Sequence, residues 1–203
     1  TIDSPLILSL KGRTHDVLAT ERLLLNILSH LSGISTHTNK IVKIAKGANS
    51  NVEILATRKT LPGLRELEKE AVVHGGGQTH RMRLDDAILI KDNHLKLSKS
   101  IKESISLSRT KYPDLMLEVE ADNEEQALEI AECGADRVML DNFTPLDAAK
   151  TIKKLRQISN IEIEISGGVT IENVAEYAKN ADFISLGSLT MSSLPIDFSL
   201  HVI

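Results

Sequence analysis

The feature that most constrains the fold is an alternation of apolar, strand-like runs with amphipathic helical segments, which begins near residue 52. Strands that alternate with helices imply a parallel sheet with right-handed crossovers. Because the strand runs are almost continuously apolar, we expect the sheet to be covered on both faces or closed into a barrel. The predicted strands are 52–56, 87–90, 115–119, 137–140, 161–165 and 183–186, and the predicted helices are 63–73, 97–109, 124–133, 145–157 and 171–179.

The first 50 residues follow a different pattern. Residues 5–10 form a short apolar run that predicts a strand. Residues 17–31 carry apolar positions at helical spacing, and Gly33 is predicted to end that helix as a glycine just beyond its last turn. Residues 38–46 predict a second helix, which ends at Gly47.

Composition excludes several classes of function for this chain of 203 residues. Aromatic residues make up only 2% and the net charge is −4, which argues against nucleic-acid binding. No run of about 18 apolar residues is present, so we expect no membrane-spanning segment. A single cysteine, Cys133, excludes an internal disulfide and fits a reducing cytoplasm. The chain begins at Thr1, without Met and without a signal-peptide pattern, so we expect that it starts inside a longer protein or was trimmed.

Cationic residues gather where the predicted strands end. In a (β/α) barrel these positions share one face, the face on which active sites lie. Cations packed together without anions are unfavourable, so a ligand with several negative charges would resolve the arrangement. The cations are Arg58, Lys59, His80, Arg81, Arg83 and Lys91. The alternative is a set of ion pairs with the carboxylates Asp85, Asp86, Asp92, Glu120 and Asp141.

Glycines and carboxylates at later strand ends complement the cations. Residues 166–168 and 187–188 carry serine and glycine after the last two strands, where barrels often bind phosphate. Glu120 and Asp141 end consecutive strands. Such a pair holds Mg²⁺ or stabilises a cationic sugar centre, unless it only neutralises neighbouring lysines.

Several segments carry a resemblance that extends over nearly the whole chain, in order. They read Thr-Arg-Lys-Thr-Leu-Pro-Gly-Leu-Arg at 57–65, His-Arg-Met at 80–82, Ile-Lys-Asp-Asn-His at 90–94, Glu-Val-Glu at 118–120, Leu-Asp-Asn at 140–142 and Glu-Ile-Ser-Gly-Gly-Val-Thr at 164–170. Together with Glu21 and Arg22 in the first predicted helix, these segments resemble the quinolinate phosphoribosyltransferase family.

The resemblance implies an α/β fold of a particular kind. It is an incomplete TIM-like (β/α) barrel with six evident strands, preceded by helices and by the remnant of an N-terminal α/β sandwich domain. A complete barrel typically needs about 250 residues, so a chain of this length agrees with a shortened one. We expect residues 1–15 to be the remnant, 16–185 the catalytic barrel and 186–203 the end of the barrel. Residues 5–13 would then be the last strand of the N-terminal domain.

The resemblance also implies a reaction and a role for each matching residue. Quinolinate reacts with phosphoribosyl pyrophosphate in the presence of Mg²⁺, giving nicotinate mononucleotide, pyrophosphate and CO₂ in de novo NAD synthesis. Quinolinate is assigned to Arg58, His80, Arg81 and Lys91, joined by Arg22 from the partner subunit of a homodimer. Catalysis is assigned to Lys59, Glu120 and Asp141, with the two carboxylates as metal ligands. Phosphate binding is assigned to Ser166, Gly167, Gly168, Gly187 and Ser188.

One position departs from the family pattern, and two other functions stay open. Met191 stands where the family often has histidine, and its side chain offers no imidazole to a phosphate. A related phosphoribosyltransferase could act on nicotinate or another aromatic acid, although nicotinate has one carboxylate and would leave part of the cationic set unpaired. A non-catalytic phosphate-binding barrel is the other alternative, although simple binding does not need Lys59 together with Glu120 and Asp141.

Overall fold

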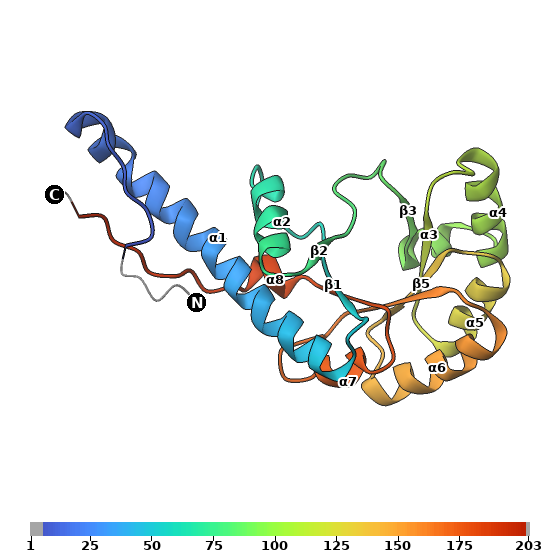
Figure 1. The fold of residues 1–203 in the computed structure, drawn as a ribbon. Helices are drawn as coiled ribbons and strands as arrows, with labels where there is room; N and C mark the ends of the chain where they lie inside the picture. Colours follow the sequence, from blue (N-terminus) through green and yellow to red (C-terminus); the bar gives the residue numbers. More distant parts are fainter. Residues whose placement is uncertain (1–5, 202–203) are drawn as a thin grey trace.

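Figure 1 shows the fold, in which one long helix precedes an alternating array of strands and helices. The structure is a computed structural model that describes residues 6–201. Its helices are α1 (Thr14–Ala48), α2 (Arg65–His74), α3 (Asp92–Leu97), α4 (Ile101–Lys111), α5 (Glu124–Glu132), α6 (Pro145–Ile158), α7 (Val174–Ala178) and α8 (Ser188–Met191). Its strands are β1 (Glu53–Ala56), β2 (Gln78–Thr79), β3 (Ile88–Ile90), β4 (Leu117–Ala121), β5 (Arg137–Asp141), β6 (Glu162–Ser166) and β7 (Phe183–Leu186).

The strands form one parallel sheet in the order β2-β1-β7-β6-β5-β4-β3. β7 pairs with β1, which joins the two ends of the alternating array as the closure of a barrel does. The sheet ends at β2 and β3, which do not pair with each other within the described residues. The predicted α/β fold, an incomplete TIM-like barrel, is therefore confirmed, and its opening lies between β2 and β3.

The six strand predictions from residue 52 onward are correct to within two residues, but the strand β2 and the helix α3 were not predicted. β2 has only two residues, both exposed and polar, so no apolar run marks it. The helix predicted at 97–109 corresponds to α4, which begins four residues later, and the separate short helix α3 precedes it. The break between them falls before Ser100, whose hydroxyl accepts the amide of Glu103 and caps α4.

The two helices predicted in the first 50 residues are one continuous helix, α1, and the predicted stop at Gly33 is wrong. The C-terminal segment runs back along α1 (Figure 1) and crosses it at this glycine. A Cβ at Gly33 would collide with the carbonyl oxygen of Leu194, and the amide of Ile196 donates to the carbonyl oxygen of Ser29 at 3.0 Å. Gly33 therefore allows a close backbone approach in the middle of a helix instead of ending it.

The N-terminal stretch also differs from expectation. Residue 5 lies outside the described residues, and residues 6–13 are not part of a strand, so the predicted strand is not formed over these positions. Every strand of the sheet follows α1 in the chain. The predicted domain boundaries stay predictions. No helix among residues 6–201 combines the length and apolar character needed to cross a membrane.

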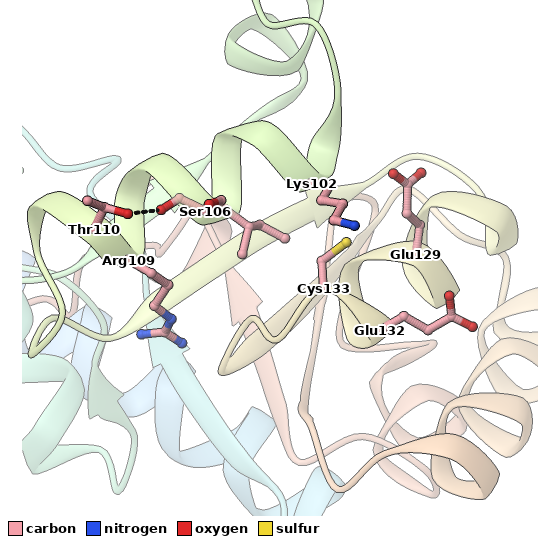
Figure 2. Close-up of a pocket in the computed structure, with 8 residues that line it drawn as sticks. Lys102, Ser106, Arg109, Thr110, Glu129, Glu132 and Cys133 are labelled. Carbon is pink, nitrogen blue, oxygen red and sulfur yellow. Dashed lines mark hydrogen bonds between the residues drawn. The ribbon is translucent and has the colours of Figure 1, made fainter.

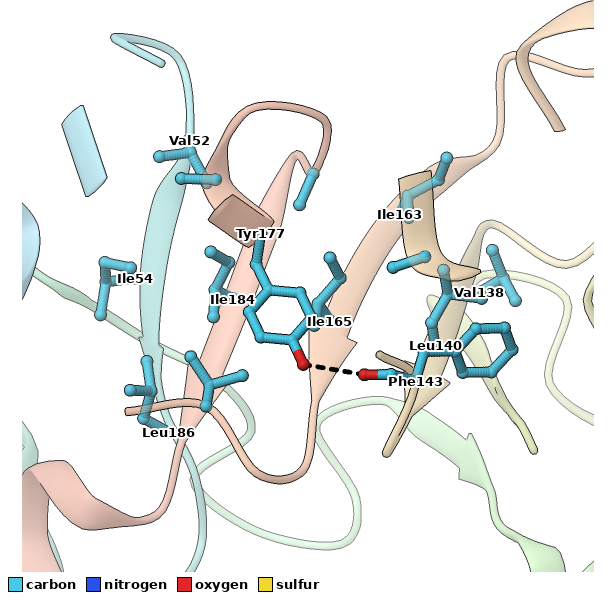
Figure 3. Close-up of a cluster of buried hydrophobic side chains, with 14 of the residues drawn as sticks. Val52, Ile54, Val138, Leu140, Phe143, Ile163, Ile165, Tyr177, Ile184 and Leu186 are labelled. Carbon is cyan, nitrogen blue, oxygen red and sulfur yellow. Dashed lines mark hydrogen bonds between the residues drawn. The ribbon is translucent and has the colours of Figure 1, made fainter. Parts of the chain in front are cut away.

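The apolar core lies between the sheet and its covering helices. Figure 3 shows side chains of β1, β5, β6 and β7 packed there with Tyr177 of α7. The Tyr177 hydroxyl donates to the carbonyl oxygen of Phe143 at 2.8 Å, which satisfies both buried groups. The helices thus bury one face of the sheet, which we call the outer face.

The opposite, inner face of the sheet carries charged side chains. On β4, Glu118 and Glu120 alternate with the outer-face residues, and they are 0% and 5% exposed. The outer-face residues of that strand belong to the apolar core and are 0% exposed: Leu117, Val119 and Ala121. Both faces are therefore buried, but only the inner face places ionisable groups inside the barrel.

Candidate active site

The strand register brings charged and polar side chains together at the carboxyl ends of the sheet. The pairing of β3 with β4 places Lys91, the residue after β3, beside Glu120 of β4. The Lys91 ammonium donates to the Glu120 carboxylate. Asp141 of β5 pairs directly with Ser166 of β6. The end of β1 pairs with the end of β7, so the loop that carries Lys59 begins beside the loop at Gly187.

Arg58 and Arg81 form the cationic part of this end. They follow β1 and β2, which are neighbours in the sheet. The Nε of each guanidinium is buried and has no hydrogen-bond partner among the described residues. Burial and the positive charge of Arg58 lower the pKa of Arg81. Two half-buried guanidiniums, each with a buried Nε that lacks a partner, favour the binding of an anion.

His80 lies inside the barrel, one residue before Arg81. Its Nε2 donates to Glu118 at 2.8 Å and lies 3.2 Å from Glu164, while its Nδ1 accepts the Arg81 amide at 2.7 Å. Burial disfavours the imidazolium, but the hydrogen bonds to the two carboxylates outweigh burial and raise the pKa of His80 to about 9. A proton on Nδ1 must displace the Arg81 amide, so the charge of His80 is coupled to the backbone at Arg81.

Glu118, Glu164 and Arg137 extend this buried network across the inner face. Burial and the charge of Glu164 raise the pKa of Glu118 to about 7. The ligand atoms of His80, Glu118 and Glu164 lie within 4.8 Å of one another, close enough to hold a metal ion. However, the His80 proton already bridges the carboxylates, and Arg137 binds Glu164 at 3.2 Å. The positive charges of His80 and Arg137 therefore compensate the two carboxylates without a metal ion.

Glu120 and Asp141 form the acidic part of the site. Glu120 pairs with Met139, and Asp141 follows two residues later on β5, so both carboxylates belong to the inner face. Asp141 accepts the Asn142 side-chain amide at 2.6 Å, as Glu120 accepts Lys91. Each carboxylate thus uses one oxygen in a hydrogen bond within the described residues. The pair matches the hard oxygen ligands that Mg²⁺ prefers.

Glycines give the neighbouring loops their shape. Gly167 and Gly168 have φ angles of 79° and 62°, which L side chains rarely adopt. A Cβ at Gly167 would also collide with the side chain of Asn142. At Gly187 a Cβ would lie 2.9 Å from the Cδ of Lys59, so this glycine leaves room for the lysine side chain. Ser166 and Ser188 flank these glycines and are partly buried.

Two of the residues singled out in the sequence lie on other elements. Arg22 is exposed on the N-terminal half of α1, which projects beyond the sheet (Figure 1). Met191 ends α8 and is 55% exposed.

Sequence reasoning missed the buried charges that support the site. Glu68 and Lys69 of α2 are 0% and 1% exposed, and Glu118 and Glu164 are both fully buried. A signal was present on the strands, because Leu-Glu-Val-Glu at 117–120 and Ile-Glu-Ile at 163–165 place acids on one face only. No comparable signal marks the charged pair on α2, since helices normally expose such residues.

A separate cavity of about 740 Å³ lies between α4 and α5 (Figure 2). Arg109 in its lining is already bound to other parts of the chain. Arg109 donates to the carbonyl oxygens of Leu115 and Gly134 and pairs with Asp136. Burial and the charge of Glu129 raise the pKa of the Cys133 thiol, which disfavours a reactive thiolate. The cavity therefore has no part in the site at the strand ends.

Comparisons with known proteins show the family and support the fold. Residues 34–201 match the family model for quinolinate phosphoribosyl transferase, C-terminal domain. Two relatives named as probable carboxylating nicotinate-nucleotide pyrophosphorylases, from Methanocaldococcus jannaschii and Archaeoglobus fulgidus, are 47% and 44% identical over 97% of this chain and 72% and 77% of their own. The crystal structure of NadC from Streptococcus pyogenes superposes with a TM-score of 0.85 at 38% identity, over 93% of this chain and 65% of that one.

Proposed function

Because the chain belongs to the quinolinate phosphoribosyl transferase family, we propose that it transfers phosphoribose from phosphoribosyl pyrophosphate to quinolinate. The products are nicotinate mononucleotide, pyrophosphate and CO₂, and the reaction serves NAD synthesis. The chain spans about two thirds of the length of the Streptococcus pyogenes protein, so the activity must be measured on the 203-residue chain itself.

The observation that carries this proposal is the pair of unpartnered guanidinium nitrogens at Arg58 and Arg81. Quinolinate has two adjacent carboxylates, and Arg binds carboxylates through its planar fork of donors. Lys91, which is exposed beside Glu120, and His80, which precedes Arg81, complete the proposed quinolinate site. A monocarboxylate such as nicotinate would leave part of this cationic set without a partner.

We assign phosphoribosyl pyrophosphate to the opposite part of the site. Lys59, which extends over Gly187, would bind the pyrophosphate as a compact charge. The loops after β6 and β7 would hold the 5′-phosphate through Ser166, Gly167, Gly168, Gly187 and Ser188. Glu120 and Asp141 would hold Mg²⁺ through their remaining oxygens, and the ion would neutralise the departing pyrophosphate.

The proposed reaction begins at the sugar. The ring nitrogen of quinolinate attacks the anomeric carbon as the bond to pyrophosphate breaks. Lys59 stabilises the leaving group, and the carboxylates of Glu120 and Asp141 favour positive charge at the sugar. Loss of CO₂ then follows, because the cationic pyridinium formed in the first step accepts the electrons of the breaking carbon–carbon bond. The carbanion left at C2 then takes a proton from water, which gives nicotinate mononucleotide, so this second step requires no general acid–base pair of side chains.

We also propose a homodimer in which Arg22 reaches the quinolinate site of the partner subunit. The exposure of Arg22 on the projecting part of α1 supports this assignment. We place the protein in the cytoplasm, since a chain whose only cysteine is Cys133 forms no internal disulfide.

A coupled assay for pyrophosphate release tests the proposal. We expect release from the 203-residue chain only when quinolinate and phosphoribosyl pyrophosphate are both present with Mg²⁺. Turnover with nicotinate and none with quinolinate would instead support a related phosphoribosyltransferase. Binding of phosphoribosyl pyrophosphate without turnover of either acid would favour the non-catalytic barrel.

Arg58→Ala tests directly whether the unpartnered guanidinium of Arg58 binds quinolinate. Calorimetry should show a loss of quinolinate binding of about 1.5–3 kcal/mol, the usual contribution of a hydrogen bond to a charged group. Arg13→Ala is the matched control, because Arg13 is exposed at the start of α1, where its guanidinium pairs with Asp16. Unchanged quinolinate affinity in Arg58→Ala would show that its assignment is wrong.

A further inference from the structure

Lys69 is a buried lysine directly behind the proposed carboxylate site. It lies on α2 with 1% exposure, although it is long and charged. Its ammonium donates to the carbonyl oxygen of His80 at 3.1 Å and to that of Arg81. These are consecutive residues of the segment that follows β2, so one ammonium fixes two successive peptide groups.

The surroundings of Lys69 make a positive charge at this position energetically unfavourable. Among the described residues no carboxylate forms an ion pair with its ammonium. Burial and the neighbouring Arg65, Arg58 and Arg81 lower the pKa of Lys69 to about 8, although Asp86 opposes the shift. A buried apolar side chain would avoid this cost, but it could not bind the two carbonyl groups.

The segment that Lys69 holds has little support from the sheet. β2 is an edge strand of two residues, and β3 does not pair with it. Beyond β2 one backbone bond to the sheet remains, from the His80 amide to the carbonyl oxygen of Ala56 at 3.3 Å. Lys69 therefore supplies two of the contacts that fix the backbone at Arg81, on the open edge of the barrel.

The same helix also holds the segment that carries Arg58. Arg65, one turn before Lys69, donates to the Thr60 hydroxyl at 3.1 Å and to the carbonyl oxygen of Met82 at 3.1 Å. α2 thus joins the loop after β1 to the segment after β2. The separation of the two guanidiniums follows from where this helix fixes each backbone.

We propose that Lys69 is a positioning residue for the quinolinate site, which sets Arg81 against Arg58 and adds a buried positive charge behind both. This inference rests on the proposed function. Lys69 does not touch the substrate, because its ammonium is turned to the two carbonyl groups. Its charge is nevertheless linked to binding. A dianion bound in front of the guanidiniums raises the pKa of Lys69, so binding near pH 8 takes up part of a proton.

Three variants separate these contributions by titration calorimetry with quinolinate at pH 8, in two buffers of different ionisation enthalpy. Lys69→Met removes both the donors and the charge, and we expect about tenfold weaker binding and reduced proton uptake. Lys69→Arg keeps donors and charge but does not titrate, so affinity should be largely restored while proton uptake stays reduced. Lys150→Met, on the exposed face of α6, controls for the loss of one lysine.

Steady-state kinetics distinguishes positioning from a general structural role. In Lys69→Met we expect KM for quinolinate to rise about tenfold, with KM for phosphoribosyl pyrophosphate unchanged within about twofold. Equal losses for both substrates, or wild-type quinolinate affinity, would overturn the inference. If Lys69→Met does not fold, Lys69→Gln, which removes the charge and carries its N–H donors on a shorter side chain, should show reduced proton uptake and a smaller rise in KM for quinolinate, and wild-type values of both would overturn the inference. Wild-type protein that neither binds nor converts quinolinate would instead overturn the proposed function, and this inference with it.

Discussion

The two faces of the same strands are both buried, but for opposite reasons. On β6, Ile163 and Ile165 belong to the apolar core between sheet and helices, while Glu164 between them faces the inside of the barrel, and all three are 0% exposed. Water is excluded from the outer face because apolar side chains pack there. The inner face is stable only because charges of both signs meet on it. The two-residue period of a strand thus separates packing from chemistry.

Ile163→Ala gives the largest expected change in stability and tests whether the outer face acts through packing alone. Removing this buried side chain should lower the free energy of unfolding by about 2–5 kcal/mol, because a cavity remains. Denaturant unfolding measures the loss, and kcat/KM per folded molecule should equal the wild-type value. A large change in kcat/KM would show that the outer face also shapes the site.

Glu120→Gln tests whether the inner face contributes to catalysis without contributing much to stability. The substitution keeps the shape of the side chain but removes the charge that faces Lys91 and, in the proposed reaction, the sugar and Mg²⁺. We expect kcat/KM to fall about 100- to 1,000-fold, with quinolinate affinity and stability changed little. Pyrophosphate release and calorimetry measure the two quantities. Retained turnover would contradict the role assigned to Glu120.

The faces also explain which features were predictable from the sequence. Apolar runs such as 161–165 located the strands, because the outer face alone supplies enough apolar residues to mark a buried strand. The ends of the strands located the candidate site, because a parallel sheet gathers them at one edge. Contacts between distant segments were not predictable, as Gly33 shows. Its spacing in the sequence is that of a helix stop, and only the tail crossing at Leu194 explains it.

The pH dependence of stability should come from the inner face. The pKa of Glu118 is raised from its ordinary value of 4.5 to about 7 by burial and by Glu164. The pKa of His80 is raised from 6.5 to about 9, because its carboxylate partners outweigh burial. A raised pKa means that the folded state holds the proton more tightly, so stability falls as the pH rises. We therefore expect the free energy of unfolding to decline between about pH 4.5 and pH 8, above which the lowered pKa of Lys69 opposes the decline that comes from His80.

Denaturant unfolding of two variants across this pH range shows how much each face contributes to the pH dependence of stability. Glu118→Gln removes one of the two titrating groups and should flatten the decline below pH 7. Ile163→Ala should lower stability by the same amount at every pH, since it carries no proton. An unchanged slope in Glu118→Gln would show that the decline arises elsewhere.

Tyr177→Phe gives the smallest expected effect and tests whether a polar bond on the outer face behaves like one on the inner face. The Tyr177 hydroxyl is buried against the carbonyl oxygen of Phe143 (Figure 3), so its removal leaves that oxygen without its donor. We expect a loss of about 1 kcal/mol, with the slope of stability against pH unchanged because the lost bond is neutral.

Phe143 lies only two residues after Asp141, so turnover is the sensitive measurement in Tyr177→Phe. Turnover should stay within about twofold of the wild-type value if the sheet insulates one face from the other. A tenfold loss would show that packing behind the sheet holds the Asp141 loop in place.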